Sequence, residues 1–213
     1  MKILCVKCDA EVANQTGKYE NFTGEIDWFG TRGKVKNAAF HLRGTSVRWY
    51  DGTWIDGNFL KGIWEKGIWE NGTWIDGKWE GGTWKNGDWF GKEWKNGTWQ
   101  NGTWQRGTWQ NGTWNDGYWK NGTWLNGTWK NGTWNTGYWN KGIWENGVWT
   151  KGYWFDGIWK NGTWKNGTWE DGTWKGGTWI KGEWEDGVGK PENAKKVPNQ
   201  KEQMELLLKS HRS

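Results

Sequence analysis

Residues 96–134 read NGTWQNGTWQRGTWQNGTWNDGYWKNGTWLNGTWKNGTW, and this stretch decides the fold. A tryptophan recurs at every fifth position, and the series continues without a slip from Trp49 to Trp184. It has 28 positions, 27 of which are Trp; the exception is Phe59. A short repeat that continues through most of a chain indicates a tandem array, in which each unit is packed by its neighbours.

A period of five excludes both regular secondary structures. Five residues of α-helix turn through about 500°, so successive Trp side chains would lie about 140° apart and form no apolar stripe. A straight strand alternates its faces with a period of two, so an odd period would send successive Trp side chains to opposite faces. The chain must therefore turn once in each repeat to keep these side chains together.

Glycine supplies the turn. It lies two residues before each repeat position from Trp54 onward, except in the segment 90–93 (Phe-Gly-Lys-Glu), where it lies one place earlier. Asn or Asp precedes the glycine in 18 of the 28 units, and Asn-Gly and Asp-Gly are strong signals for tight turns. Half of the residues before Trp are Thr, which favours extended backbone. Each unit thus consists of a three-residue β-segment and a corner.

The first architecture that fits this unit is an all-β solenoid. Each repeat forms one side of a square coil, with Trp and Gly inside and Thr, Lys and Asn outside. Coils about 4.8 Å apart would stack the 28 repeats into about seven coils, a rod of roughly 34 Å. The motif Trp-Ile-Asp at 54–56 recurs at 74–76, four repeats later, which favours four repeats per coil.

This unit resembles the pentapeptide-repeat family, in which a large apolar residue is central and a small residue lies two places before it. In this chain Trp is the large central residue and Gly is the small residue two places before it, over about two thirds of the sequence. The usual Ala-Asp/Asn-Leu consensus of that family is absent. The resemblance implies a quadrilateral β-solenoid.

An antiparallel meander is the alternative architecture. The run Trp-Lys-Asn-Gly-Thr-Trp resembles designed tryptophan-zipper hairpins, in which Trp residues pair across two strands. All Trp side chains would then lie on one exposed apolar face that needs a partner. We favour the coil, because it buries the Trp side chains within one chain.

The ends of the chain differ from the array. We predict an N-terminal β cap over residues 1–48, the repeat array over 49–189, and a linker with a short helix over 190–213. Met204, Leu207 and Leu208 share one side of the predicted helix, residues 199–211. This helix either folds back over the last coil as a cap or docks into a partner.

Charge and hydropathy point away from nucleic acid and membrane. The net charge is +5, but residues 49–189 carry 15 Lys+Arg against 16 Asp+Glu, so the array has no basic footprint for nucleic acid. The N-terminus lacks the apolar core of a signal peptide, and no apolar stretch is long enough to span a membrane. We expect a cytosolic origin, which includes particle assembly inside a host cell.

The sequence offers few residues for chemistry. Cys5 and Cys8 form a C-x-x-C pair, but a closed zinc site needs four ligands and no second Cys pair exists. His41 and His211 could complete a site, or two chains could pool half-sites. Carboxylates and lysines are spread evenly by the repeat. We therefore predict no catalytic, cofactor-binding or metal-binding residue, no small-molecule ligand and no enzyme activity.

Arrays of Gly-Thr-Trp-x-Asn/Asp look like proteins encoded in tailed-bacteriophage genomes. That resemblance implies a structural component of the virion (a rod, spike or decoration) whose partners are other virion components or its own copies. It would be assembled in the host cytoplasm. Two alternatives stay open. One is a glycan- or nucleic-acid-binding module that uses exposed Trp, and the other is a cytoplasmic scaffold that engages a host protein.

Overall fold

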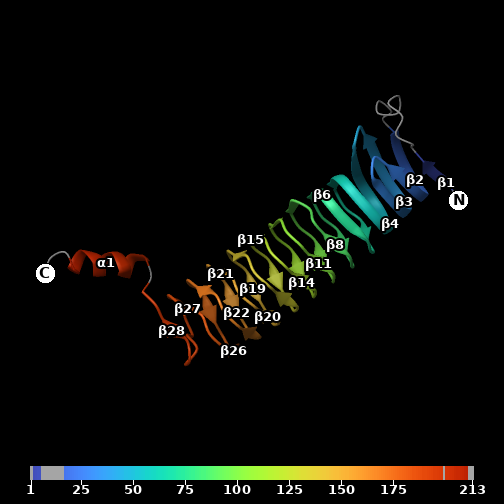
Figure 1. Cartoon of the computed structure of the whole chain (residues 1–213). Coiled ribbons are helices and arrows are strands. Elements are labelled where there is room, and N and C mark those ends of the chain that lie inside the picture. Colours follow the sequence, from blue (N-terminus) through green and yellow to red (C-terminus); the bar gives the residue numbers. More distant parts are fainter. Residues whose placement is uncertain (1, 6–16, 199, 211–213) are drawn as a thin grey trace.

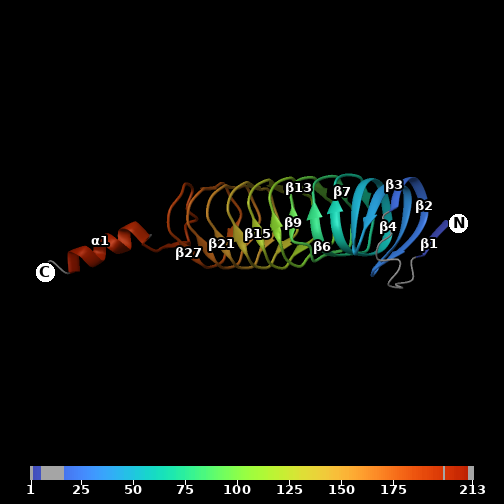
Figure 2. The ribbon, with the colours of Figure 1, turned by 90° about the horizontal axis from the view of Figure 1, so that it is seen from above.

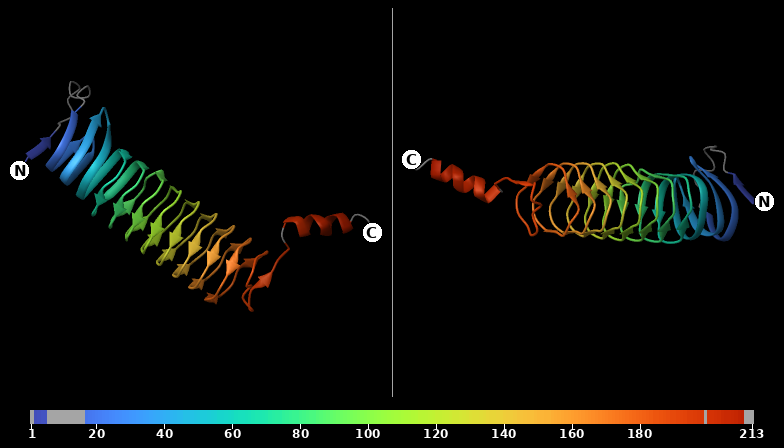
Figure 3. Two further views of the ribbon diagram at one scale, coloured as in Figure 1. Left: turned by 180° about the vertical axis from the view of Figure 1, so that it is seen from behind. Right: turned by 90° about the horizontal axis from the view of Figure 1, so that it is seen from below.

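The molecule is a straight rod built from one continuous coil. The computed structural model describes residues 2–5, 17–198 and 200–210. Short strands wind around a single axis from the N-terminal strands to the far end, where helix α1 (Gln200–Ser210) projects away from the rod (Figures 1 and 2). The view from below shows the same coil of ribbon (Figure 3). Buried aromatic side chains fill its interior.

Each coil contains three repeats. Strand β10 (Thr98–Trp99) pairs in parallel with β13 (Thr113–Trp114), which begins three repeats later. The same offset recurs along the array, as in the pair formed by Trp169 and Trp184. The predicted β-solenoid is confirmed. The four-sided cross-section is wrong, because the coil has three sides, and the antiparallel meander is wrong for the array, because its strands pair in parallel. Three repeats per coil give a little more than nine coils, roughly 45 Å of rod.

Apart from one two-residue strand, the first six strands are longer than the two-residue strands that follow them. They are β1 (Lys2–Cys5), β2 (Gly17–Trp28), β3 (Thr31–Arg43), β4 (Ser46–Trp64), β5 (Ile68–Trp69) and β6 (Thr73–Trp79). The next are β7 (Thr83–Trp84), β8 (Asp88–Trp89), β9 (Glu93–Trp94), β11 (Thr103–Trp104), β12 (Thr108–Trp109), β14 (Tyr118–Trp119), β15 (Thr123–Trp124), β16 (Thr128–Trp129) and β17 (Thr133–Trp134). Then follow β18 (Tyr138–Trp139), β19 (Ile143–Trp144), β20 (Val148–Trp149), β21 (Tyr153–Trp154), β22 (Ile158–Trp159), β23 (Thr163–Trp164), β24 (Thr168–Trp169), β25 (Thr173–Trp174), β26 (Thr178–Trp179), β27 (Glu183–Trp184) and β28 (Lys195–Lys196).

Two backbone hydrogen bonds per repeat join one coil to the next. The amide of Thr113 donates to the carbonyl of Gly97 at 3.0 Å, and the amide of Asn115 donates to the carbonyl of Trp99 at 2.8 Å. At several corners an Asn or Asp side chain accepts the amide of the glycine that follows it. The Oδ1 atom of Asp116, for example, accepts the amide of Gly117 at 2.7 Å. The predicted Asn/Asp-Gly corner is therefore present, and its side chain satisfies a donor that the ladder leaves unpaired.

The corner glycines have a backbone conformation that other residues rarely adopt. Gly97 and Gly112 have φ values of 131° and 125°, a region that only glycine adopts readily. A Cβ on Gly112 would lie 2.4 Å from the Gly97 carbonyl oxygen of the preceding coil. The same Cβ would lie 3.2 Å from Cζ2 of Trp109, so the glycine also leaves room for the rings, as its predicted inward position implies. Glycine is required by the turn and by the close approach of two coils.

An antiparallel sheet closes the N-terminal end. Strand β1 pairs in parallel with β2, and β2, β3 and β4 pair antiparallel in chain order. Strand β4 begins in this sheet and continues into the first repeats. Phe40 stacks on Trp49 with ring centroids 5.8 Å apart, so an aromatic ring covers the first Trp. The segments 37–40 and 44–47 belong to the hairpin that β3 and β4 form.

Residues 188–197 cover the other end. The Val188 carbonyl accepts the amide of Trp174, and the amide of Val197 donates to the carbonyl of Trp184, both at 2.8 Å. Asn193 donates to the carbonyl of Trp179, and Ala194 is 3% exposed. Each side of the last coil is thus capped by this segment. The predicted helix is present, but it does not fold back as the cap.

Candidate functional site

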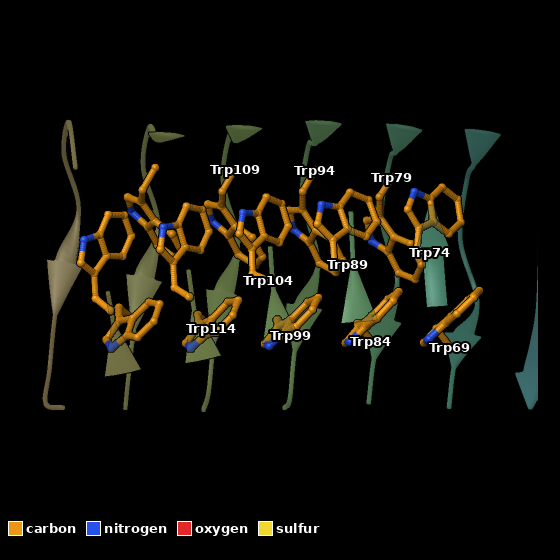
Figure 4. Close-up of a cluster of buried hydrophobic side chains, with 14 of the residues drawn as sticks. Trp69, Trp74, Trp79, Trp84, Trp89, Trp94, Trp99, Trp104, Trp109 and Trp114 are labelled. Carbon is orange, nitrogen blue, oxygen red and sulfur yellow. The ribbon is translucent and has the colours of Figure 1, made fainter. Parts of the chain in front are cut away.

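The inward-facing rings form three columns along the rod (Figure 4). The first column holds Trp49, Trp64, Trp79, Trp94, Trp109, Trp124, Trp139, Trp154, Trp169 and Trp184; the second takes every third repeat from Trp54 to Trp174; the third does likewise from Phe59 to Trp179. Within a column rings stack, as Trp99 does on Trp114, with centroids 4.8 Å apart and planes 6° apart. Between columns they meet edge to face, as Trp109 and Trp114 do at 6.0 Å and 73°.

These columns leave no indole for a ligand. Every Trp of the array from Trp49 to Trp169 is 0% exposed, and the largest value in the array is 6% at Trp174. The alternative function that relied on exposed Trp therefore loses its basis. The Trp residues form the structural interior, and sites for partners must be sought on the outer surface.

The indole N–H groups point toward the corners of the following coil. Trp149 Nε1 donates to the Asn166 carbonyl at 3.1 Å, and Trp159 Nε1 donates to the Gly176 carbonyl at 3.0 Å. Among the described residues, 23 other buried indole nitrogens have no hydrogen-bond partner. A buried unpaired donor costs about 1–3 kcal/mol. Ring burial and stacking must therefore outweigh this cost in the array.

Outside, side chains of equal position in successive coils form ladders. Lys85 pairs with Glu70 at 3.1 Å, and Lys160 with Glu145 at 3.0 Å, each across three repeats. The other ion pairs with this offset are Lys66–Asp51, Lys78–Glu93, Lys95–Glu80 and Lys141–Asp156. Each exposed pair contributes little, about 0–1 kcal/mol. Opposite charges three repeats apart nevertheless indicate that one coil contains three repeats. This signal is present in the sequence, but the prediction of four repeats per coil did not use it.

An aromatic ladder stands out on the face that covers the first column. It consists of Tyr138, Tyr153 and Phe155. The two tyrosine residues are about half exposed and their rings stack at 5.5 Å, and Phe155 lies nearly parallel to Tyr138 at 6.3 Å. Because these rings stack along the rod axis, they present their edges to solvent. This is an apolar surface of the kind that protein partners use.

Helix α1 carries the other concentration of exposed apolar side chains. Met204, Leu206, Leu207 and Leu208 are between 56% and 62% exposed. Lys196 pairs with Glu202 at 3.0 Å, and Gln203 donates to the Pro198 carbonyl at 2.8 Å, so the start of the helix is tied to the capping segment. The helix stands clear of the rod (Figures 1 and 2). It is therefore well placed for attachment to another molecule.

A hollow marks the place where the repeat breaks. We name it the repeat-break notch; it lies between Ile75, Asp76, Phe90, Gly91, Lys92 and Arg106 and has a volume of about 450 Å³. The Lys92 ammonium lies 3.4 Å from the Asp76 carboxylate, and Arg106 Nε donates to the Phe90 carbonyl at 3.3 Å. Two cations and one carboxylate thus meet two apolar side chains at one corner of the rod.

Carboxylates accumulate on the last coils. Burial raises the pKa of Glu170, and burial together with the charges of Glu170 and Glu183 raises the pKa of Glu185. At the other end of the array, burial raises the pKa of Asp51, but hydrogen bonds from Gly52 and Lys66 outweigh it, so that the pKa is lowered. Ionisation of Glu170 and Glu185 therefore opposes the native state of the C-terminal coils, chiefly because both carboxyl groups are partly buried.

The residues considered for metal binding are not brought together in the described structure. His41 lies in β3, and Cys5 ends β1, whereas Cys8 and His211 lie outside the described residues. Within residues 2–5, 17–198 and 200–210, no group of three or more His, Cys, Asp or Glu side chains could hold a metal ion. A pooled zinc half-site at Cys5 and Cys8 stays a hypothesis.

The chain has no recognisable counterpart in the comparisons with known proteins. No protein-family model, no curated protein and no solved structure matches it. Among the described helices, none is long and apolar enough to cross a membrane. The chain is a Trp-rich tandem five-residue β-solenoid.

Proposed function

We propose that this chain is a non-enzymatic structural protein that serves as a stiff rod, and that it is a bacteriophage virion component acting as a rod, spike or decoration. The observation that carries the proposal is the continuous triple column of rings, buried along the whole array. Every coil is joined to the next by stacked rings and by two hydrogen bonds per repeat. Such a body resists bending and proteolysis, and all of its repeats contribute to shape.

The ends and faces supply points of attachment. Helix α1 exposes four large apolar side chains beyond the capped end of the rod. Other virion components, or copies of the same chain, are the partners that this arrangement suits. The resemblance of Gly-Thr-Trp-x-Asn/Asp arrays to phage-encoded proteins supports the virion, assembled in the host cytoplasm, as the location.

Immunoelectron microscopy tests this proposal. Particles are produced from the genome that encodes the chain, purified, and labelled with an antibody raised against the array. We expect label at a fixed place on the particles. Label that stays in the soluble lysate and is absent from purified particles would contradict the virion assignment.

A host-directed scaffold in the cytoplasm is the second candidate, and the aromatic ladder favours it. Exposed tyrosines are frequent anchors of protein interfaces. In this case the soluble protein would associate with one host protein. Replacing Tyr138 and Tyr153 together by Ser would abolish the association but leave the rod folded, because both side chains lie outside the core.

A further inference from the structure

The repeat break leaves a corner without a side chain. In chain order the corner positions on this edge of the rod are Lys61, Asp76, Gly91, Arg106 and Asn121, each three repeats from the next. Gly91 is buried, and a Cβ there would lie 2.4 Å from Trp89 Cζ2 and 2.7 Å from Trp74 Nε1. The backbone of Gly91 is thus pressed onto the indoles. Side chains reach the corner only from the coils on either side, roughly 10 Å apart.

The break leaves neighbouring coils joined by hydrogen bonds. The carbonyl of Lys92 takes the place of the usual glycine carbonyl and accepts the amide of Thr108 at 2.9 Å, and the Lys92 amide donates to the Gly77 carbonyl at 3.1 Å. Trp94 still stacks on Trp79 at 4.7 Å. The break is felt inside the coil at Trp89, whose ring stacks on Trp74 at 5.2 Å and on Trp104 at 5.1 Å, slightly farther apart than regular pairs of the column. On the outer surface the irregular residues line the repeat-break notch.

Three kinds of chemistry meet in the notch. Arg106 is held over it by its Nε bond to Phe90, and no other described residue forms a hydrogen bond or ion pair with its two terminal nitrogens. Oδ1 of Asp76 accepts a hydrogen bond from the amide of Gly77 at 2.8 Å, and Oδ2 lies 3.4 Å from the Lys92 ammonium. Phe90 and Ile75, on adjacent coils, supply an apolar wall.

Each group selects a different part of a ligand. The two terminal nitrogens of the Arg106 guanidinium suit a carboxylate, which they can bind through two parallel hydrogen bonds. Asp76 accepts hydrogen bonds, so it favours hydroxyl groups and repels a ligand that is only an anion. The wall of Phe90 and Ile75 suits the C–H face of a ring. A volume of about 450 Å³ lies within the usual range of small-ligand sites.

We propose that the repeat-break notch binds a uronic-acid sugar, that is, a ring carrying both a carboxylate and hydroxyl groups. The carboxylate of the sugar accepts hydrogen bonds from Arg106 and Lys92. One of its hydroxyl groups donates to Asp76, and its ring packs against Phe90. A neutral sugar lacks the first contact, and an aromatic carboxylate lacks the second. This site goes beyond the proposed structural role and does not depend on it.

Isothermal titration of the full chain tests the proposal with D-glucuronate, glucose and benzoate as probes. We expect saturable binding of glucuronate and at least tenfold weaker binding of the other two, a difference of about 1.4 kcal/mol. A short polygalacturonate fragment distinguishes a free sugar acid from one within a polysaccharide. No saturation with glucuronate or the fragment, or benzoate binding as tightly as glucuronate, would overturn the proposal.

Two variants locate the site. Arg106→Gln removes the guanidinium group, and the double variant Gly91→Asn with Lys92→Gly restores a regular Asn-Gly corner and fills the notch. We expect both to lose at least tenfold in affinity for glucuronate. The matched control is Arg48→Gln, which removes an exposed arginine paired with Glu65 and should bind as the parent does. Unchanged affinity in Arg106→Gln overturns the assignment, even if the double variant fails to fold.

Discussion

At the scale of single residues, the corner glycines and the ring residues have separate tasks. Glycine sets the corner through its positive φ, and Asn or Asp before it accepts the glycine amide. Trp fills the interior by itself, because no second inward residue competes for space. Substitutions at these two positions should therefore destabilise the rod for different reasons.

Gly112→Ala tests the corner. The new Cβ would meet the Gly97 carbonyl at 2.4 Å, at a φ of 125° that alanine rarely adopts. We expect a loss of about 1–3 kcal/mol in the free energy of unfolding, measured by urea denaturation. Gly176→Ala is the matched control, because its φ is not positive and its Cβ would lie 3.6 Å from the nearest carbonyl oxygen. Equal stability of both variants would refute the role given to Gly112.

Trp114→Ala tests the column. Trp114 is fully buried and stacks on Trp99 and Trp129, so removing its ring leaves a cavity. We expect a loss of about 3–5 kcal/mol, and a smaller loss for Trp114→Phe, since Phe59 already occupies one such place. Thr113→Ala, on the outer side of the same strand, should lie within about 1 kcal/mol of the parent. Denaturant midpoints that rank these variants otherwise would contradict the assignment of inside and outside.

At the scale of elements, the stability of the last coils is expected to depend on pH. Glu170 and Glu185 occupy equal positions on adjacent coils, and the pKa of each is raised above its ordinary value of 4.5. The native state therefore binds their protons more tightly than the unfolded state does. Their contribution to stability is complete below pH 4.5 and is lost as the pH rises through the raised native pKa values.

Lowering the pH from neutral toward the ordinary pKa of a glutamate should accordingly strengthen the C-terminal coils. Hydrogen exchange of the Glu183 and Val188 amides, corrected for the intrinsic pH dependence, reports this locally, because both amides bond to the preceding coil. We expect slower exchange at the lower pH. The double variant Glu170→Gln with Glu185→Gln should remove most of that response; an unchanged response would show that other groups cause it.

At the scale of the whole molecule, the rod is closed at both ends. Ending the chain after Val197 removes α1, whose apolar side chains are exposed, and should change the melting temperature by less than about 2 °C. Ending it after Gly187 also removes Val188, Asn193 and β28, which cover the last coil. Open strand edges pair with other chains. We expect this shorter form to self-associate in light scattering, and a size and melting curve like the parent's would contradict the capping role.

Intrinsic fluorescence reports the state of all the columns at once. Since the array indoles are at most 6% exposed, we expect a blue-shifted emission maximum and weak quenching by acrylamide. The same measurement in denaturant supplies the reference for exposed indoles. A red-shifted, readily quenched native signal would be incompatible with a closed coil.

Much of this architecture follows from local chemistry and could be predicted. An odd period of five, glycine in each unit and Asn or Asp before it require an extended segment and a corner, whatever surrounds them. Burial of Trp49 to Trp184 follows from the size of the indole. Even the C-terminal helix, at residues 200–210, lies close to the range expected for it.

The number of sides was decided only by the tertiary structure. It depends on how rings three repeats apart stack and how rings of successive repeats meet edge to face, and the glycine φ must fit both. The stacking contacts are not local in sequence. The same holds for the repeat-break notch, because Asp76, Gly91 and Arg106 become neighbours only when a coil closes after three repeats. Local chemistry along the chain settles which side chains are inside and where the chain turns. The packing of rings between coils settles the angle of the turn and which side chains meet outside.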